Sequence, residues 1–248
     1  MAVNALTSFA NREVMDLVFV DYNTKKPILN WPLANATTTS VTGEVVHAYG
    51  GAGRPKRVAF YGDKTGTLVL ETQMQSYALY SIMTGGDITT TADFLEREEI
   101  KCITAGQLAL RGTPVGDVNV FKSGDDCGTP IAGVTTTTSG STATATAASG
   151  ITVGETYIVY YIKSFTSGVT NIRIAADTFP KATTIYGTTV SRTEDDQVVA
   201  QKLIAYKASP QLQAEWSFSN SGDPATLSVT FDLMADEQDR VLDLITIE

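Results

Sequence analysis

The strongest catalytic pattern in the sequence lies at residues 63–68, DKTGTL. An aspartate followed by two threonines could act in phosphoryl transfer, with the Asp63 carboxylate as covalent nucleophile and a threonine hydroxyl binding the transferred group. That chemistry also needs the aspartate at the end of a parallel strand, a distant lysine and an acidic loop that binds magnesium. The elements around the motif therefore decide whether the chemistry is available.

The motif matches the phosphorylation loop of P-type ATPases and the DxTxT pattern of haloacid-dehalogenase enzymes, but its surroundings favour another structure. Side chains alternate in residues 58–61 and again in 68–71, on either side of a Gly-Asp-Lys-Thr-Gly tip. Two such runs around a glycine-containing tip are typical of an antiparallel hairpin. The nearest acidic pair, residues 125–126, lies in a glycine-rich segment without a preceding apolar strand. We therefore interpret residues 62–66 as a hairpin turn, and a phosphotransfer enzyme that uses Asp63 is the alternative.

A short helix is predicted directly after this hairpin. Thr72 and Gln75 stand at the spacing of a capping box, in which the two side chains satisfy backbone donors at a helix start. The predicted helix covers residues 73–83 and stops at Gly85-Gly86, where glycine tolerates the left-handed conformation. Its core-facing side would be formed by Ala78, Leu79, Ile82 and Met83, with parts of Tyr77 and Tyr80.

A second candidate site is the loop at residues 49–57, YGGAGRPKR, which combines glycine with positive charge. A loop that cradles phosphate would end in the GKS/T pattern of a P-loop and open a helix, and this loop does neither. We interpret it as a flexible or interface loop. His47, the only histidine, and the two cysteines, Cys102 and Cys127, have no metal-binding or acid-base partners at a suitable spacing. We therefore expect no catalytic residue, no cofactor and no metal.

The composition indicates a folded protein: 43% of the 248 residues are hydrophobic and 18% are charged. The formal net charge of −9 argues against tight binding of nucleic acid, because affinity for phosphates comes from Lys and Arg. No apolar run approaches the roughly 18 residues of a membrane helix. The start of the chain has no basic segment like that of a signal peptide. We expect a protein that is made in a cytoplasm and does not enter a membrane.

The fold class expected from the pattern is mainly β: an antiparallel β-sandwich or barrel with one short flanking helix. Residues 213–219 and 227–233 alternate around a Ser-Gly-Asp-Pro turn and predict a second hairpin. The Thr/Ala/Ser/Gly-rich residues 123–154 predict an exposed hairpin with weakly polar faces, and a mobile linker is the competing interpretation. Other strands are predicted at residues 13–21, 28–33, 37–48, 100–110, 117–122, 157–165 and 183–191, and residues 198–205 and 241–247 could be strands or helices.

Three stretches carry a resemblance to a known family: residues 61–87, residues 94–100 (FLEREEI) and residues 216–234 (WSFSNSGDPATLSVTFDLM). Together they resemble the tail tube proteins of contractile-tailed bacteriophages, whose fold is similar to that of type VI secretion and pyocin tubes. The resemblance covers most of the chain in order and rests on structural patterns. It implies one tail-tube-like β domain over residues 1–248, with residues 123–154 as an insertion or exposed hairpin.

The resemblance also implies a function, that of a structural virion protein. Copies would form hexameric rings that stack into a hollow tube, assembled in the host cytoplasm and located in the phage tail. DNA would pass through the lumen without specific binding, and the tail sheath, tape measure and baseplate proteins would be partners. An acidic lumen would repel phosphate, and ring assembly would cover unpaired strand edges. The alternative within virions is a tail terminator or head decoration protein.

Under this hypothesis, loop and turn residues make the contacts between copies. The charge run at residues 96–99 could be a solvated face or a subunit contact. The N-terminal arm, residues 1–12, would bridge rings together with the loop at residues 49–57. The residues expected at the assembly interface are Tyr49, Gly50, Gly51, Arg54, Lys56, Arg57, Asp63, Lys64, Glu96 and Arg97.

Overall fold

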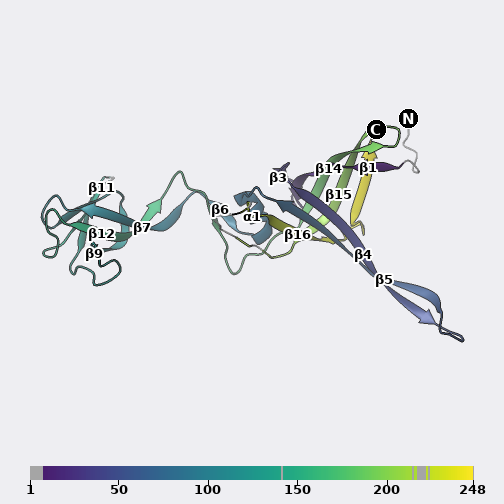
Figure 1. The fold of residues 1–248 in the computed structure, drawn as a ribbon, viewed down its shortest axis with the longest axis horizontal. Helices are drawn as coiled ribbons and strands as arrows, with labels where there is room; N and C mark the ends of the chain where they lie inside the picture. Colours follow the sequence, from purple (N-terminus) through teal and green to yellow (C-terminus); the bar gives the residue numbers. More distant parts are fainter. Residues whose placement is uncertain (1–7, 141, 214, 217–221, 223, 248) are drawn as a thin grey trace. The chain divides into compact units, whose positions relative to one another are not determined.

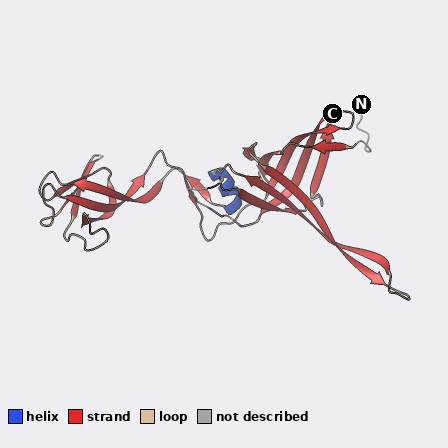
Figure 2. Cartoon of the chain, viewed as in Figure 1, coloured by secondary structure: helices blue, strands red, loops and turns tan. Residues whose placement is uncertain are grey.

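In the computed structural model the chain forms two compact units, unit 1 from Met1–Ile88 with Ile172–Glu248 and unit 2 from Thr89–Asn171 (Figure 1). The structure describes residues 8–140, 142–213, 215–216, 222 and 224–247. Within these residues strands dominate and one helix is present (Figure 2). The strand pairs are antiparallel in both units. The predicted mainly β, antiparallel fold is therefore confirmed.

Unit 1 is built on one large sheet. Its strands run in the order β3-β2-β14-β15-β16-β5-β4, with β1 added beside β14 and β17 beside β15. The strands are β1 (Phe9–Asn11), β2 (Asp16–Asp21), β3 (Pro27–Trp31), β4 (Ala36–Tyr49), β5 (Lys56–Thr72), β14 (Thr183–Thr193), β15 (Val198–Pro210), β16 (Leu227–Met234) and β17 (Leu242–Ile247).

The core of unit 1 follows from alternation along its strands. In β16, Leu227, Val229, Phe231 and Leu233 are buried, and the residues between them point away from the core. Helix α1 (Tyr77–Thr84) places Leu79, Ile82 and Met83 in the same cluster. One sheet face and one helix stripe thus share a single core.

The predicted helix is confirmed, but its start was wrong. The N-cap is Ser76, whose hydroxyl accepts from the backbone N–H of Leu79 at 3.1 Å. Thr72 does not cap it, because this last residue of β5 is buried and its hydroxyl donates to the carbonyl of Leu33 at 2.9 Å. The helix ends as predicted at Gly85, which has φ 73° and donates to the carbonyl of Ser81.

The predicted hairpin turn at residues 62–66 was also wrong. These residues lie within β5, which runs unbroken from Lys56 to Thr72 and pairs with β4 over nearly its whole length. The chain reverses instead at residues 50–55. Gly62 lies in a bulge instead of a turn: the register changes between the pairs Gly43–Lys64 and Val45–Tyr61, so residues 62–63 lie opposite Glu44.

Unit 2 contains two three-stranded sheets and its own core. The first sheet has the order β7-β12-β9 and the second has the order β10-β11-β8. Two short strands that pair with each other, β6 (Asp87–Thr89) and β13 (Asn171–Arg173), lie where the chain passes between the units. The strands of unit 2 are β7 (Ala92–Lys101), β8 (Gln107–Leu110), β9 (Pro114–Lys122), β10 (Thr135–Ser139), β11 (Thr142–Thr146) and β12 (Thr156–Phe165).

The threonine-rich segment forms the predicted hairpin, β10 with β11. Its two faces are not both weakly polar, however. Ala143 and Ala145 are buried in the core of unit 2, because β11 lies between β10 and β8 and turns its alanines inward. The strand predicted at residues 100–110 is broken at 102–106 by a turn in which the N–H of Gln107 bonds the carbonyl of Thr104.

The remaining sequence predictions have mixed outcomes. The ambiguous residues 198–205 and 241–247 form strands β15 and β17. Much of the first arm of the second hairpin, residues 213–219, lies outside the described residues, and its second arm is β16. The single domain over residues 1–248 stays a prediction, and residues 123–154 fall inside unit 2.

We expect residues 89–171 to fold when expressed alone, because the core of this unit is formed by its own residues. The measurement is urea unfolding followed by the fluorescence of Tyr157 and Tyr161, two buried tyrosines of a unit that contains no tryptophan. A cooperative transition is the expected result. A gradual loss of signal without a transition would contradict it.

Glu98 belongs to the charge run for which a solvated face and a subunit contact were the two interpretations, but it is 6% exposed and faces the core of unit 2. Its carboxylate accepts a 2.5 Å hydrogen bond from the Tyr161 hydroxyl and bonds from the backbone N–H of Arg111 at 3.1 and 3.2 Å. Burial and the neighbouring Glu98 raise the pKa of Tyr161 well above its ordinary value. Tyr161 therefore stays protonated and donates to the buried carboxylate.

Replacing this donor in Tyr161→Phe is expected to lower the free energy of unfolding of unit 2 by about 1–3 kcal/mol, because Glu98 stays buried with fewer donors. Tyr160→Phe is the matched control, since the neighbouring hydroxyl bonds an exposed carboxylate and its loss should change stability by less than about 0.5 kcal/mol. Urea unfolding of both variants measures the difference. Equal losses would show that the Glu98 contact contributes nothing specific.

Candidate assembly surface

The outer half of the β4–β5 hairpin, residues 43–64, extends beyond the rest of the sheet, and we call it the outer arm (Figure 1). β16 pairs with β5 only from Gly66 to Thr72. Within the described residues, the strands of the outer arm therefore pair only with each other. A two-stranded ribbon is marginally stable by itself in water, so the outer arm depends on further contacts.

The outer arm exposes large apolar side chains. Tyr61 is 82% exposed, Val46 64% and Phe60 59%. Other exposed apolar residues of the same hairpin are Val41, Val45, Tyr49 and Val58. A concentration of exposed apolar side chains on one short element is typical of an interaction site in soluble proteins.

The turn of the hairpin carries positive charge. Gly50 N–H donates to the carbonyl of Pro55 at 3.3 Å, and Arg57 Nε donates to the carbonyl of Gly50 at 3.1 Å. Gly51 has φ 89°, a conformation that favours glycine. Residues 49–57 contain three basic residues and no acidic one, and among described residues none of the three is in an ion pair. The basic side chains of the turn can therefore pair with acidic groups of another molecule.

The phosphoryl-transfer motif lies in the same hairpin. Asp63 and Lys64 are exposed residues in the middle of an antiparallel strand, not at the end of a parallel one. Thr65 shares a hydrogen bond of 2.9 Å with the hydroxyl of Thr42 across the ladder. No group of three His, Cys, Asp or Glu side chains in the described part of the chain is placed to hold a metal ion. The motif therefore lacks the geometry that phosphoryl transfer needs.

Glu96 and Arg97 are not brought together with the hairpin residues in one compact unit, since they lie on β7 of unit 2. Glu96 is 3.6 Å from Lys163 Nζ. Arg97 bonds Asp126 Oδ2 from Nε at 3.1 Å and from its terminal nitrogen at 2.8 Å, and Tyr160 donates to Asp126 Oδ1. These bonds, that from Arg97 first, hold the pKa of Asp126 below its ordinary value.

The structure thus divides the ten predicted interface residues into two groups. Two are Glu96 and Arg97, which already have partners inside unit 2. The other eight lie on the hairpin: Tyr49, Gly50, Gly51, Arg54, Lys56, Arg57, Asp63 and Lys64. The role of all ten in assembly stays a prediction.

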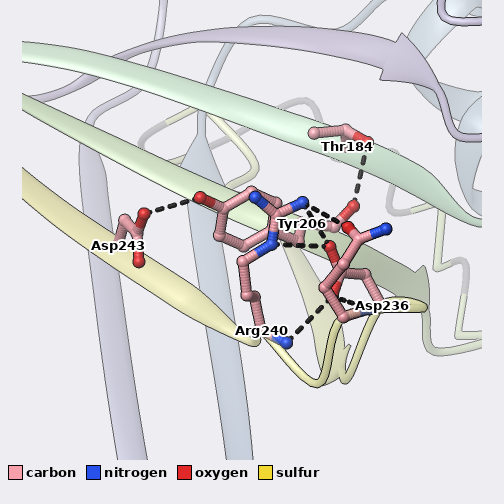
Figure 3. Close-up of polar contacts among 6 residues, drawn as sticks. Thr184, Tyr206, Asp236, Arg240 and Asp243 are labelled. Carbon is pink, nitrogen blue, oxygen red and sulfur yellow. Dashed lines mark hydrogen bonds and ion pairs between the residues drawn. The ribbon is translucent and has the colours of Figure 1, made fainter.

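A polar cluster of unit 1 ties the loop before β17 to the sheet (Figure 3). Arg240 donates to Asp236 Oδ2 from Nε at 3.0 Å and from its terminal nitrogen at 2.7 Å, and its guanidinium lies 4.0 Å from the centroid of the Tyr206 ring. Tyr206 in turn donates to Asp243 on β17, and Thr184 on β14 donates to the carbonyl of Tyr206. None of the sequence predictions covers residues 236–240, although an arginine four residues after an aspartate was the available signal.

This cluster predicts a pH dependence. The bond from Arg240, followed by backbone bonds from Arg240 and Gln238, lowers the pKa of Asp236 below 3.8 in the folded chain. The stabilisation is therefore complete above the unfolded pKa and is lost as the pH falls through the lower folded pKa. We expect Asp236→Asn to be less stable than wild type near about pH 6 and the difference to shrink towards about pH 2. Urea unfolding across this range, with Asp239→Asn as the control, measures it; a difference independent of pH would contradict the assignment.

The residues that sequence reasoning missed are the apolar pairs of the outer arm. The alternation in residues 58–61 predicts one arm of a hairpin, and residues 45–46 lie within the strand predicted at residues 37–48. A signal was present in both, because consecutive apolar residues break the alternation expected for a strand with one solvated face.

The fold defines a mainly β, antiparallel protein that carries a separately packed second unit and an apolar arm. The chain belongs to the YomU/Tube protein family, whose sequence model matches residues 11–247. The match covers nearly the whole chain and confirms the resemblance to phage tail tube proteins, which places this chain in a family of structural tube proteins. A search of curated proteins found no match. Among the described residues no helix is long and apolar enough to cross a membrane.

Proposed function

We propose that this chain is the structural subunit of a contractile phage tail, in which hexameric rings of copies stack into a hollow tube that delivers DNA. The observation that carries the proposal is the outer arm, a paired ribbon of residues 43–64 with exposed apolar side chains and no support from its own sheet. Such a ribbon gains its stabilising contacts when it packs against other copies.

The sheet of unit 1 offers edges for ring closure. Among described strands, β4 pairs only with β5 and β3 only with β2, so each end of the sheet leaves one ladder side for a neighbour. Two different edges on one subunit make a head-to-tail contact, which closes into a ring when the rotation fits. The sheets of adjacent copies would then continue into one another around the lumen.

The net charge of the chain and the basic turn of the hairpin support the proposed lumen and the proposed contacts between rings. The net charge of −9 suits a lumen that DNA crosses without binding. The basic turn at residues 49–57, with Asp63 and Lys64, and the N-terminal arm would contact the next ring, and Glu96 and Arg97 would contact neighbouring copies or partners. The sheath, tape measure and baseplate proteins are the expected partners, and assembly in the host cytoplasm places the protein in the virion tail.

The test is negative-stain electron microscopy and analytical ultracentrifugation of the purified protein over a range of concentration and salt. The expected result is sixfold rings and stacked tubes, with antibody against the chain labelling the tails of virions. A monomer under every condition would overturn the proposal. Labelling of the capsid surface would instead identify a head decoration protein.

A further inference from the structure

Consecutive residue pairs along the outer arm lie on opposite faces of the ribbon. Val45 is paired with Tyr61, and the next pair along the ladder is Val46 with Phe60. Residues directly opposite each other in an antiparallel ladder share a face, and successive pairs alternate between faces. The first pair therefore lies on one face of the outer arm and the second pair on the other.

Both faces of the outer arm are apolar and exposed. On one face Tyr61 and Val45 are 82% and 41% exposed, and on the other Val46 and Phe60 are 64% and 59% exposed. Contact with a single flat partner would bury one pair and leave the other in water. The apolar character of the second pair would then have no stabilising role.

The inner half of the same hairpin shows what a ribbon covered on one side looks like. There, Leu68 and Leu70 are buried in the core of unit 1. The opposite face carries hydroxyl pairs, Ser40 with Thr67 and Thr42 with Thr65, each bonded at 2.9 Å. The run of hydroxyl pairs ends at the bulge of residues 62–63, and beyond it each face carries an exposed apolar pair. The inner half of the hairpin is thus suited to packing on one face, and the outer arm is suited to packing on both.

We propose that the outer arm inserts between two further copies of this chain, one packed on the Val45–Tyr61 face and the other on the Val46–Phe60 face. This inference rests on the proposed self-assembly and specifies its contact. Charge favours copies of the chain as the occupants. Residues 49–57 hold three basic residues and no acidic residue, whereas the chain as a whole has a net charge of −9, so a second copy offers a net acidic surface to the basic turn.

The test measures burial of each face separately. Val45→Cys and Val46→Cys are made in a Cys127→Ser background, because Cys127 is exposed and Cys102 is buried. Thiol labelling by a maleimide is timed before and after assembly. At both positions the rate is expected to fall on the order of tenfold or more, as for side chains in the packed centre of an interface. Val153→Cys, at a 54% exposed position of unit 2 that is not among the predicted interface residues, is the control and should label at an unchanged rate.

A second pair of variants tests each face without introducing cysteine, whose substitution could itself disturb the ribbon. Val45→Thr with Tyr61→Thr and Val46→Thr with Phe60→Thr keep strand propensity and remove the apolar surface of one face each. Both double variants are expected to reduce the assembled fraction in sedimentation.

The possible outcomes separate the two proposals. Assembled wild type with protection at only one cysteine, or with one silent double variant, overturns the two-sided insertion and leaves the proposed tube function standing. A wild-type chain that never assembles overturns the tube function and the insertion with it.

Discussion

A chain in which residues 44–63 are replaced by an Asn-Gly turn is expected to fold normally and to lose assembly. Gly43 and Lys64 are paired in the ladder, so two residues can join them as a tight type I′ hairpin. The buried residues of the unit 1 core lie outside the removed segment. The truncated chain therefore keeps the whole core of unit 1 and loses only the outer arm.

The effect on assembly should be large. Full burial of an apolar side chain contributes about 1.5–3 kcal/mol, so the four side chains Val45, Val46, Phe60 and Tyr61 could together contribute about 6–12 kcal/mol before ordering costs. Even a quarter of this would change an association constant by about tenfold or more for each contact. Truncated chains should consequently remain unassembled at concentrations where wild type forms rings.

Analytical ultracentrifugation and electron microscopy measure the loss, and urea unfolding of the unassembled chain provides the control for folding. The unfolding transition of unit 1 should be retained. Truncated chains that form tubes like those of wild type would show that the outer arm is not the assembly element. A truncated chain that fails to unfold cooperatively would instead show that the arm supports the fold of unit 1.

Phe231→Ala is expected to give the largest loss of stability. Phe231 is fully buried at the centre of β16, is paired with Leu68 of β5, and has its ring centroid 5.6 Å from that of Phe19. Removing a buried phenylalanine side chain costs about 3–5 kcal/mol through lost burial and the cavity left behind. Natural domains are stable by only about 5–15 kcal/mol, so this substitution removes a large share of the total.

Tryptophan fluorescence during urea unfolding is the measurement, because Trp31 and Trp216 both belong to unit 1. Ser228→Ala, at an exposed position of the same strand, is the control and should change stability by less than about 0.5 kcal/mol. The transition of unit 2, which contains no tryptophan and is therefore followed by circular dichroism, should stay unchanged in both variants, because its core is formed by other residues. A shift of both transitions in Phe231→Ala would show that the two units unfold together.

Local patterns predicted those elements whose signals are contained in their own residues. The alternation in residues 227–233 predicted β16, and the β-branched and aromatic run at residues 157–165 predicted β12. The helix end at Gly85 was correct because a left-handed glycine cap depends on a single residue. The helix start was not, because Ser76 and Thr72 offer the same hydroxyl and only the burial of Thr72 decides between them.

At the candidate site, too, local patterns failed where a contact with a distant residue decides the structure. Gly62 and Gly66 have the composition of a turn, yet they lie inside β5 because β4 supplies a partner along the whole strand. Glu98 sits in a charge run that resembles a solvated face, yet the alternation of β7 turns it into the core of unit 2, where Tyr161 donates to it. In each case the deciding contact comes from a residue distant in sequence.

The mainly β, antiparallel class, the position of helix α1 and the resemblance to tube proteins followed from the amino-acid sequence, because alternation, caps and motifs are properties of neighbouring residues. The place where the long hairpin turns, the division of the chain into two packed units and the exposure of the hairpin's side chains became visible in the three-dimensional structure. These features depend on which strands pair and in what register. Residues 63–68, which first suggested a phosphoryl-transfer loop, are therefore part of a strand whose outer end leaves apolar side chains exposed.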